Sequence, residues 1–195
     1  MGTAKSARSQ ESAQHERPGP AVILITGVMA SGKSTVAQAL AERLPRAVHV
    51  RGDVFRRMVV SGRAEMVPGA YEEAAAQLRL RYRLSAMTAD TYAEEGWTAV
   101  VQDVVLGEEL NAYLDLVRTR PLYAVVLAPE TCAVAEREAG RTKSGYGAGW
   151  TVEALDQVLR EETPRVGLWL DTTGQSVDQT VDAVLDGLER ARVTG

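Results

Sequence analysis

The chain has one cysteine, two histidines and few aromatic residues, which make up 5% of the sequence. A single cysteine, Cys132, can form neither a disulfide within the chain nor a cysteine metal cluster, as is usual in reducing compartments. Because Cys132 follows an expected strand and has no neighbouring histidine, we interpret it as a packed thiol without a catalytic role. The sequence therefore points away from disulfide scaffolds and cysteine-based zinc sites.

Long apolar runs and a strong charge of one sign are also missing. No stretch approaches the roughly 20 apolar residues of a membrane-spanning helix, and the polar start, Met1 to Gln14, lacks the apolar core of a signal peptide. Acidic and basic residues are interspersed and give a formal net charge of -4, so no basic field favours a long polyanion. We expect a cytoplasmic protein that neither crosses a membrane nor is secreted, and nucleic acid is a disfavoured partner.

The remaining composition is that of one globular domain. The 195 residues are 45% hydrophobic and 25% charged, which is enough for one well-buried core. Residues 1–20 are rich in Ser, Gln, Arg, Glu and Pro, and such a segment cannot bury enough surface to offset the entropy of ordering. We predict a flexible N-terminal tail at 1–20 and a single domain at 21–195.

From Ala21 onwards, short apolar runs alternate with longer stretches of helical periodicity. This alternation predicts an α/β fold with a parallel sheet and crossover helices. The expected strands are Ala21–Thr26, Ala47–Val50, Thr98–Gln102, Leu122–Leu127 and Val166–Leu170. The expected helices are Lys33–Leu44, Val54–Ser61, Tyr71–Glu95, Glu108–Arg118, Glu130–Arg141, Val152–Glu162 and Ser176–Arg192.

The most specific motif is the glycine-rich segment from Gly27 to Thr35, between the first strand and the first helix. It fits the phosphate-binding pattern Gly-x4-Gly-Lys-Ser, in which backbone N–H groups and a helix N-terminus surround the phosphates of a nucleotide. Lys33 is predicted to contact the transferred phosphates of ATP and Ser34 to ligate Mg²⁺. The predicted nucleotide-binding residues here are Gly27, Ala30, Ser31, Gly32, Lys33, Ser34 and Thr35.

A carboxylate, Asp53, follows the second strand where a helix begins. Ligands of doubly wound sheets bind at this edge, so Asp53 is a candidate general base for an acceptor hydroxyl. Arg56, one helical turn later, is a candidate to hold the acceptor or the transferring phosphoryl group. The alternatives are an N-cap for Asp53 and a surface ion pair for Arg56.

A second carboxylate, Asp103, closes the third strand. Acidic residues at this place in phosphate-loop enzymes often organise Mg²⁺ through its water shell, and we predict Mg²⁺ binding for Asp103 together with Ser34. A role as an acceptor contact or as a second candidate base is equally compatible with its position.

Basic residues after the fourth strand are candidates to bind phosphates. Arg137 and Arg141 are four residues apart on one helix face, and Lys143 follows. The glycine-rich segment 144–150 then suggests a mobile flap, with an ordinary surface loop as the alternative. Thr172, after the last strand, is a candidate to border the adenine.

The long helix expected at 71–95 alternates arginines with large apolar residues. Arg79, Arg81 and Arg83 stand between Leu78, Leu80, Tyr82 and Leu84. Core packing with a solvated basic side is the favoured interpretation, and an acceptor pocket or a dimer face is the alternative. Monomer and homodimer both stay open.

These motifs together resemble the chloramphenicol phosphotransferase family, within the wider group of small P-loop kinases. The resemblance spans most of Ala21 to Val193 and rests on the phosphate loop, Asp53 and the segments Val101–Gly107, Ala133–Glu138 and Leu170–Thr173. It implies a three-layer P-loop fold with a five-stranded parallel sheet, a lid, ATP with Mg²⁺, and an aspartate at Asp53 that deprotonates the acceptor. Gln102 departs from the pattern, since an acidic residue is expected there.

The resulting hypothesis is an ATP-dependent kinase that transfers the γ-phosphoryl group to a hydroxyl of a small molecule, such as an antibiotic or a sugar-like metabolite. Lys33, Asp53, Arg56 and Arg137 are its predicted catalytic residues. Because the spacing from Asp53 to Arg56 is also similar to that in polynucleotide 5′-kinases and zeta-type toxins, a polynucleotide or nucleotide-sugar acceptor is an alternative. A nucleotide-binding regulatory module is another.

Overall fold

The computed structural model describes residues 19–65, 72–140 and 150–194, and its centre is a five-stranded parallel sheet. The strand order is β2-β3-β1-β4-β5, with all neighbouring pairs parallel. The strands are β1 (Ala21–Gly27), β2 (Ala47–Arg51), β3 (Thr98–Gln102), β4 (Leu122–Leu127) and β5 (Leu168–Leu170). The predicted α/β fold with five parallel strands is thereby confirmed.

The three inner strands are buried along their whole length. They consist almost entirely of Val, Ile, Leu and Ala, and such residues suit strands covered on both faces. In the register of the sheet, Ile23 of β1 lies opposite Val100 of β3 on one side and Tyr123 of β4 on the other.

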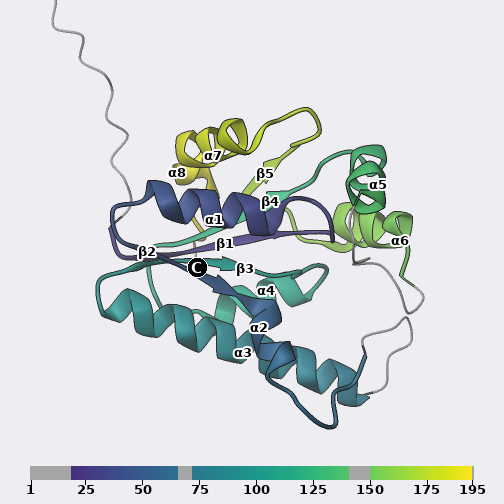
Figure 1. Ribbon diagram of the computed structural model, residues 1–195. Helices are drawn as coiled ribbons and strands as arrows, with labels where there is room; N and C mark the ends of the chain where they lie inside the picture. Colours follow the sequence, from purple (N-terminus) through teal and green to yellow (C-terminus); the bar gives the residue numbers. More distant parts are fainter. Residues whose placement is uncertain (1–18, 66–71, 141–149, 195) are drawn as a thin grey trace, which may run out of the picture.

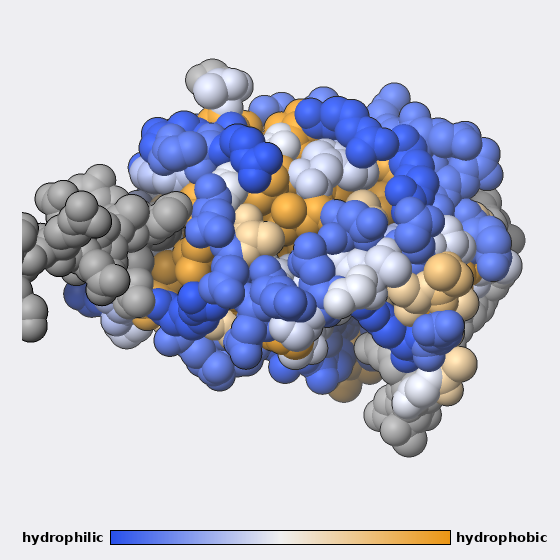
Figure 2. Space-filling model, turned by 90° about the horizontal axis from the view of Figure 1, so that it is seen from above, coloured by the Kyte–Doolittle hydropathy of each residue, from blue (hydrophilic) through white to orange (hydrophobic). Residues whose placement is uncertain are grey.

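Helices cover both faces of the sheet (Figure 1). The helices on one face are α1 (Lys33–Arg43), α7 (Val177–Asp186) and α8 (Leu188–Ala191), and those on the other are α3 (Glu72–Glu94) and α4 (Glu109–Leu116). The remaining helical segments are α2 (Gly52–Arg57), α5 (Thr131–Ala139), α6 (Val152–Gln157) and a one-turn π-helix, η1 (Val158–Glu162). Seen from above, hydrophilic side chains cover most of the helical layer, and hydrophobic ones are visible in the gaps between them (Figure 2).

Side-chain alternation along β3 divides the core into two clusters. Val100 packs in the cluster beneath α1 and α7, whereas Ala99 and Val101 pack in the cluster beneath α3 and α4. Because successive side chains of a strand point to opposite faces, Gln102 belongs to the α1 side and the next residue, Asp103, to the α3 side. This alternation decides how the candidate site is divided.

Several sequence-based expectations need correction. The single helix expected at 176–192 is interrupted at Gly187, which separates α7 from α8. At this point the backbone comes close to β5, since an added Cβ would lie 2.6 Å from Leu168 Cδ2. The helix expected at 152–162 changes to a π-helix after Gln157. Cys132 is exposed near the start of α5 and is not a packed thiol.

Some predictions concern segments outside the described residues. They are most of the expected tail at 1–20, the phosphate-binding candidates Arg141 and Lys143, and nearly all of the expected flap. Within the residues that are described, no helix has both the length and the apolar character needed to cross a membrane.

Candidate functional site

The predicted site residues converge at one edge of the sheet because parallel strands end together there. The phosphate loop follows β1, Asp53 follows β2, Asp103 follows β3 and Thr172 follows β5. Residues that are far apart in the sequence are thereby placed around a common edge, which is where open α/β sheets bind their ligands.

The phosphate loop adopts backbone conformations that its glycines permit. Gly32 has φ 95°, and Gly27 has φ 144° with a carbonyl beside it: an added Cβ would lie 2.4 Å from Leu127 O. Ala30 also has a positive φ, 61°, although it carries a Cβ. A turn that is held in these conformations directs successive N–H groups inward and forms an anion-binding concavity.

Lys33 and Ser31 belong to this loop, and Thr172 follows β5 at the same edge of the sheet. Lys33 is buried, and its Nζ donates to Val28 O at 2.6 Å, so the ammonium group lies across the loop. The buried Oγ of Ser31 and Oγ1 of Thr172 have no hydrogen-bond partner among the described residues. Buried hydroxyls without partners are costly, and they fit a ligand-binding site better than a purely structural turn.

Ser34, the predicted Mg²⁺ ligand, contacts Gln102. Its Oγ donates to Gln102 Oε1 at 3.1 Å. Arg51 is the β2 residue opposite Gln102 in the sheet, and its side chain is about half exposed. A neutral amide and a cation therefore stand beside Ser34, where the sequence pattern led us to expect a carboxylate.

Arg137 joins the phosphate loop to the segment after β5. Its Nη1 donates to Ser31 O at 3.5 Å, and its Nη2 donates to Thr172 O at 2.8 Å. Lys33 and Arg137, which are both predicted to bind phosphates, therefore contact the same loop, although Arg137 belongs to α5. The segment itself is held by Thr173, whose Oγ1 accepts from Glu130 N at 2.8 Å.

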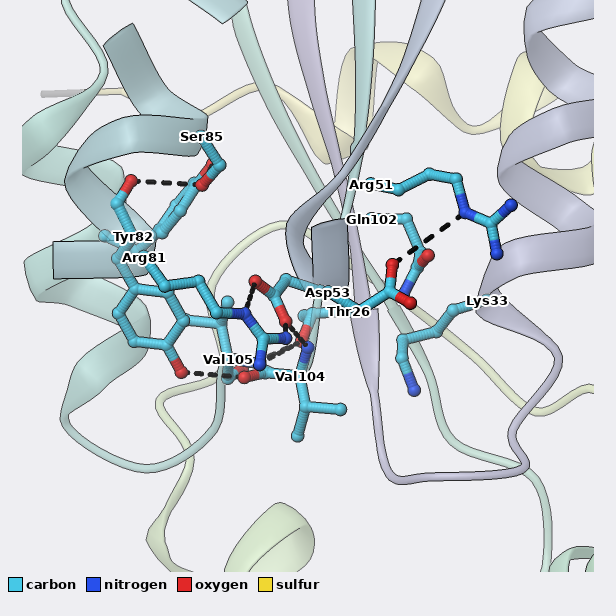
Figure 3. A network of polar contacts seen from close by, with 12 residues as sticks. Thr26, Lys33, Arg51, Asp53, Arg81, Tyr82, Ser85, Gln102, Val104 and Val105 are labelled. Atoms are coloured by element: carbon cyan, nitrogen blue, oxygen red, sulfur yellow. Dashed lines mark hydrogen bonds and ion pairs between the residues drawn. The ribbon is translucent and has the colours of Figure 1, made fainter. Parts of the chain in front are cut away.

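Asp53 lies in the first turn of α2 and is not its N-cap, which is Arg51. The N-cap alternative therefore fails. The carboxylate is about half exposed and forms an ion pair with Arg57 at 2.9 Å, with Arg51 at 3.9 Å on its other side. In Figure 3, Asp53 lies between Arg81 on one side and Arg51 with Lys33 on the other.

Arg56, the second candidate in α2, has a carboxylate partner. It pairs with Glu65, as the surface alternative expected, and it also lines a cavity between α2 and α3. Arg56 therefore lies in the wall of this cavity, one helical turn after Asp53.

Asp103 is fully buried and faces α3, not Ser34. Its Oδ2 accepts from Arg81 Nε at 2.7 Å, its Oδ1 pairs with Arg81 Nη2, and Oδ1 also accepts from Val104 N at 2.7 Å. The carboxylate is thus not brought together with Ser34. Among the described residues, no group of three or more His, Cys, Asp and Glu side chains could hold a metal ion.

Sequence reasoning missed Arg81, which was expected on the solvated side of the long helix. Its side chain is only 16% exposed. Burial lowers the pKa of Arg81 from its ordinary value, and the Tyr82 hydroxyl and the Asp53 carboxylate act in the opposite direction. Helical spacing contained the signal: Arg81 is three residues after Leu78 and four before the buried Ser85, on the inward face.

Solved structures share this fold. A sugar kinase from Janibacter sp. HTCC2649 has a TM-score of 0.64 and 20% identity, with 88% of this chain and 95% of that chain covered. A gluconokinase from Sinorhizobium meliloti 1021 has a TM-score of 0.61 and 22% identity, with 88% and 93% covered. The Mycobacterium tuberculosis APS kinase CysC, in complex with AMPPNP and APS, has a TM-score of 0.60 and 17% identity, with 86% and 96% covered.

No curated protein matches the chain in a sequence search. The finer resemblance to chloramphenicol phosphotransferases is therefore supported only as a P-loop kinase-like fold. The family described as an AAA domain matches residues 22–164, which include the phosphate loop, Asp53, Asp103 and Arg137. Because this match covers well over half of the sequence, the chain belongs to that AAA domain family.

Proposed function

We propose that the protein is an ATP-dependent kinase that phosphorylates a hydroxyl of a small molecule. One observation carries the proposal: Lys33 and Arg137 contact the same phosphate loop, while a carboxylate, Asp53, stands at the same edge of the sheet, after the end of β2. Phosphoryl transfer needs cations on the phosphates and a base near the attacking oxygen, and this edge of the sheet supplies both.

The phosphate loop would bind the β- and γ-phosphates of ATP. Lys33 would exchange its hydrogen bond with Val28 O for the phosphate oxygens, and Arg137 would neutralise charge from the α5 side. Thr172 and its neighbours would border the adenine, as the sequence predicts. That the APS kinase with the same fold is in complex with AMPPNP supports ATP as the nucleotide.

Mg²⁺ fits this site through Ser34. Mg²⁺ usually keeps several waters and takes one or two protein ligands together with phosphate oxygens, so one hydroxyl and the nucleotide suffice to hold it. When bound, the ion neutralises charge on the transferred phosphoryl group. For Asp103 to join Ser34 as a ligand, its pair with Arg81 would have to break, so we place Asp103 on the acceptor side.

Asp53 would act as the general base. The acceptor hydroxyl loses its proton to the Asp53 carboxylate, its oxygen bonds to the γ-phosphorus, and the bond from that phosphorus to the bridging oxygen of ADP breaks. Arg51 and Arg57 hold the carboxylate in place, and Arg56 lies beyond it toward the acceptor.

The experiment incubates the purified chain with ATP, Mg²⁺ and a panel of hydroxylated antibiotics, sugars, nucleosides and 5′-hydroxyl oligonucleotides, and identifies phosphorylated products by mass spectrometry. A product that requires intact Lys33, tested with Lys33→Ala, is expected. The variant Asp53→Asn should lower the turnover of that acceptor by about 100-fold to 10,000-fold while nucleotide binding is kept.

Other outcomes distinguish the alternatives. Phosphorylation of the oligonucleotides alone would support an end-processing kinase, against which the net charge of -4 already argues. Nucleotide binding without a product from any member of the panel would support a regulatory module and contradict the kinase proposal. Normal turnover by Asp53→Asn would exclude Asp53 as the base.

A further inference from the structure

The ion pair between Asp103 and Arg81 is built as a fixed unit. Arg81 donates side-on through Nε and Nη2 to both carboxylate oxygens, and Asp103 is fully buried. The backbone N–H of Val104 adds a third hydrogen bond to the same carboxylate. A two-point pair of this kind fixes the guanidinium plane, and the carboxylate offsets its positive charge locally. Arg81 is therefore a hydrogen-bond donor of fixed orientation with little net charge to offer.

Arg81 also lines a cavity of about 100 Å³ between α2 and α3. Most of the lining is apolar, and its large members are Phe55, Val59, Leu78, Leu80 and Leu84. Arg56, which also lines the cavity, lies one helical turn after Asp53 in α2, so the cavity lies near the proposed base. Its position and apolar lining suit the apolar part of a small acceptor molecule.

The polar groups of the cavity wall are already engaged. Arg56 pairs with Glu65, just as Arg81 pairs with Asp103. Gln77 donates to Gly62 O at 2.8 Å and accepts from Ala64 N at 3.0 Å. Each of the two arginines that line the cavity therefore has its own carboxylate partner. Because Asp103 binds Nε and Nη2 of Arg81, the Nη1 group of Arg81 is left to donate to a ligand.

We propose that this cavity binds an uncharged, largely apolar alcohol and that Arg81, held and neutralised by Asp103, donates a hydrogen bond to a second, neutral oxygen of that molecule. The inference rests on the proposed kinase function, because it assigns the acceptor of that reaction. A carboxylate or phosphate on the acceptor would lose hydration in a largely apolar cavity whose two arginines are already paired with carboxylates. Asp103 is thus a positioning residue that selects against anionic acceptors.

A matched pair of probes tests the charge preference with the full chain. The compounds 3-phenylpropane-1,2-diol and 3-phenyllactate share an apolar body and a hydroxyl, but only the second carries a carboxylate. Ligand-observed NMR titrations are expected to give a dissociation constant about tenfold lower for the diol, since like charges across a contact disfavour the acid. Equal or tighter binding of 3-phenyllactate, or no binding of the diol, overturns the proposal.

Two variants place the preference on the named residues. Glu65→Gln removes the exposed carboxylate that pairs with Arg56. It should tighten the binding of 3-phenyllactate several-fold and leave the binding of the diol nearly unchanged. The control is Glu95→Gln, just after the far end of α3, which should change neither affinity. Arg81→Gln should weaken the binding of the diol, whereas Arg83→Gln, an exposed arginine on the same helix, should not. Circular dichroism checks that each variant is folded, and unchanged binding in folded Arg81→Gln contradicts the assignment.

Failure of this inference is distinguishable from failure of the proposed function. Mass spectrometry of the same mixtures with ATP and Mg²⁺ reports transfer, whereas NMR reports binding alone. Transfer to anionic acceptors but not to neutral ones would support the kinase and overturn the charge preference. Selective binding of the diol without transfer to any acceptor of the panel would support the cavity assignment and contradict the kinase.

Discussion

Gly52 leaves open the space that the carboxylate of Asp103 occupies. A Cβ added at Gly52 would lie 1.8 Å from Asp103 Oδ2 and 2.4 Å from its Cγ. Gly52 immediately precedes Asp53 and begins α2, so the turn that carries the proposed base rests directly on the carboxylate that holds Arg81. This contact couples the turn that carries the proposed base to Arg81 in the cavity wall.

Replacing Gly52 with alanine should therefore disturb both stability and acceptor binding. The added methyl group has no room unless Asp103 or the start of α2 moves, and overpacking of this kind costs about 1–3 kcal/mol. Urea unfolding should show the loss, and the affinity for the acceptor should fall while that for the nucleotide changes little. Gly174→Ala is the control, because no atom lies within 4 Å of an added Cβ there. An undiminished stability of Gly52→Ala would mean that the contact is looser than described.

Gln102 sets the electrostatics beside the proposed magnesium ligand. Its Oε1 accepts from Ser34 Oγ, so a glutamate at this position would place a carboxylate next to the ion. We expect Gln102→Glu to lower the Mg²⁺ concentration needed for half-maximal binding of a fluorescently labelled nucleotide, because added negative charge strengthens the binding of a hard cation. The measurement is a Mg²⁺ titration at constant ionic strength.

The control for Gln102→Glu is Asn111→Asp, which adds the same charge on the exposed surface of α4. It should leave the Mg²⁺ dependence as in the unaltered protein. The same midpoint for Gln102→Glu and the unaltered protein would argue that the ion binds away from Ser34.

Arg137 is expected to contribute to nucleotide affinity. Its guanidinium bridges Ser31 O and Thr172 O, so in the proposed site it would lie between the phosphates and the nucleoside. Hydrogen bonds from a charged group are worth about 1.5–3 kcal/mol, and Arg137→Gln should accordingly weaken ATP binding by about 10-fold to 100-fold. Isothermal titration calorimetry measures this loss, with the exposed Arg190→Gln as a variant of equal charge change. If both variants weakened ATP binding equally, Arg137 would contribute only through the net charge of the protein and not through its hydrogen bonds.

The phosphate loop could be predicted from sequence because its determinants are local. The glycines at 27 and 32, the lysine and the following helix all lie within a few residues, and the strand before them is a continuous apolar run. Asp53 and Arg137 could be placed at this edge of the sheet for a related reason: Asp53 closely follows the end of a predicted strand, and Arg137 lies on the helix that follows another. Parallel topology brings such ends together without further information.

The pairing of Asp103 with Arg81 could not be predicted in the same way. The two residues are 22 positions apart, and their contact depends on the packing of α3 against the sheet. Strand alternation, which assigns Gln102 to the side of α1 and Asp103 to the side of α3, was available in the sequence. An interpretation based on motifs uses the position of Asp103 at the end of the strand and ignores the face of the sheet to which its side chain points. It therefore predicts Asp103 as a metal ligand.

A buried carboxylate outside the site, Asp90, makes a separate prediction about acid stability. Asp90 accepts hydrogen bonds from Thr119 N at 2.9 Å, from Thr119 Oγ1 at 2.7 Å and from Arg118 N at 3.1 Å. Burial raises the pKa of Asp90, but the hydrogen bonds from Thr119 and Arg118 outweigh it and leave the pKa below its ordinary value of 3.8. The folded state therefore favours the ionised carboxylate, which ties α3 to the chain that enters β4.

A lowered pKa in the folded state means that this stabilisation is fully present above pH 3.8 and is lost as the pH falls through the folded value. Asp90→Asn should reduce the free energy of unfolding at pH 7 by about 1.5–3 kcal/mol, because its amide N–H₂ would face the backbone donors of Arg118 and Thr119. Urea unfolding at pH 7, 5 and 3 should show the difference from the unaltered protein narrowing only at the lowest pH. Asp115→Asn, an exposed change on α4, should leave the pH dependence intact. A difference that stays constant down to pH 3 would show that Asp90 acts through packing and not through its charge.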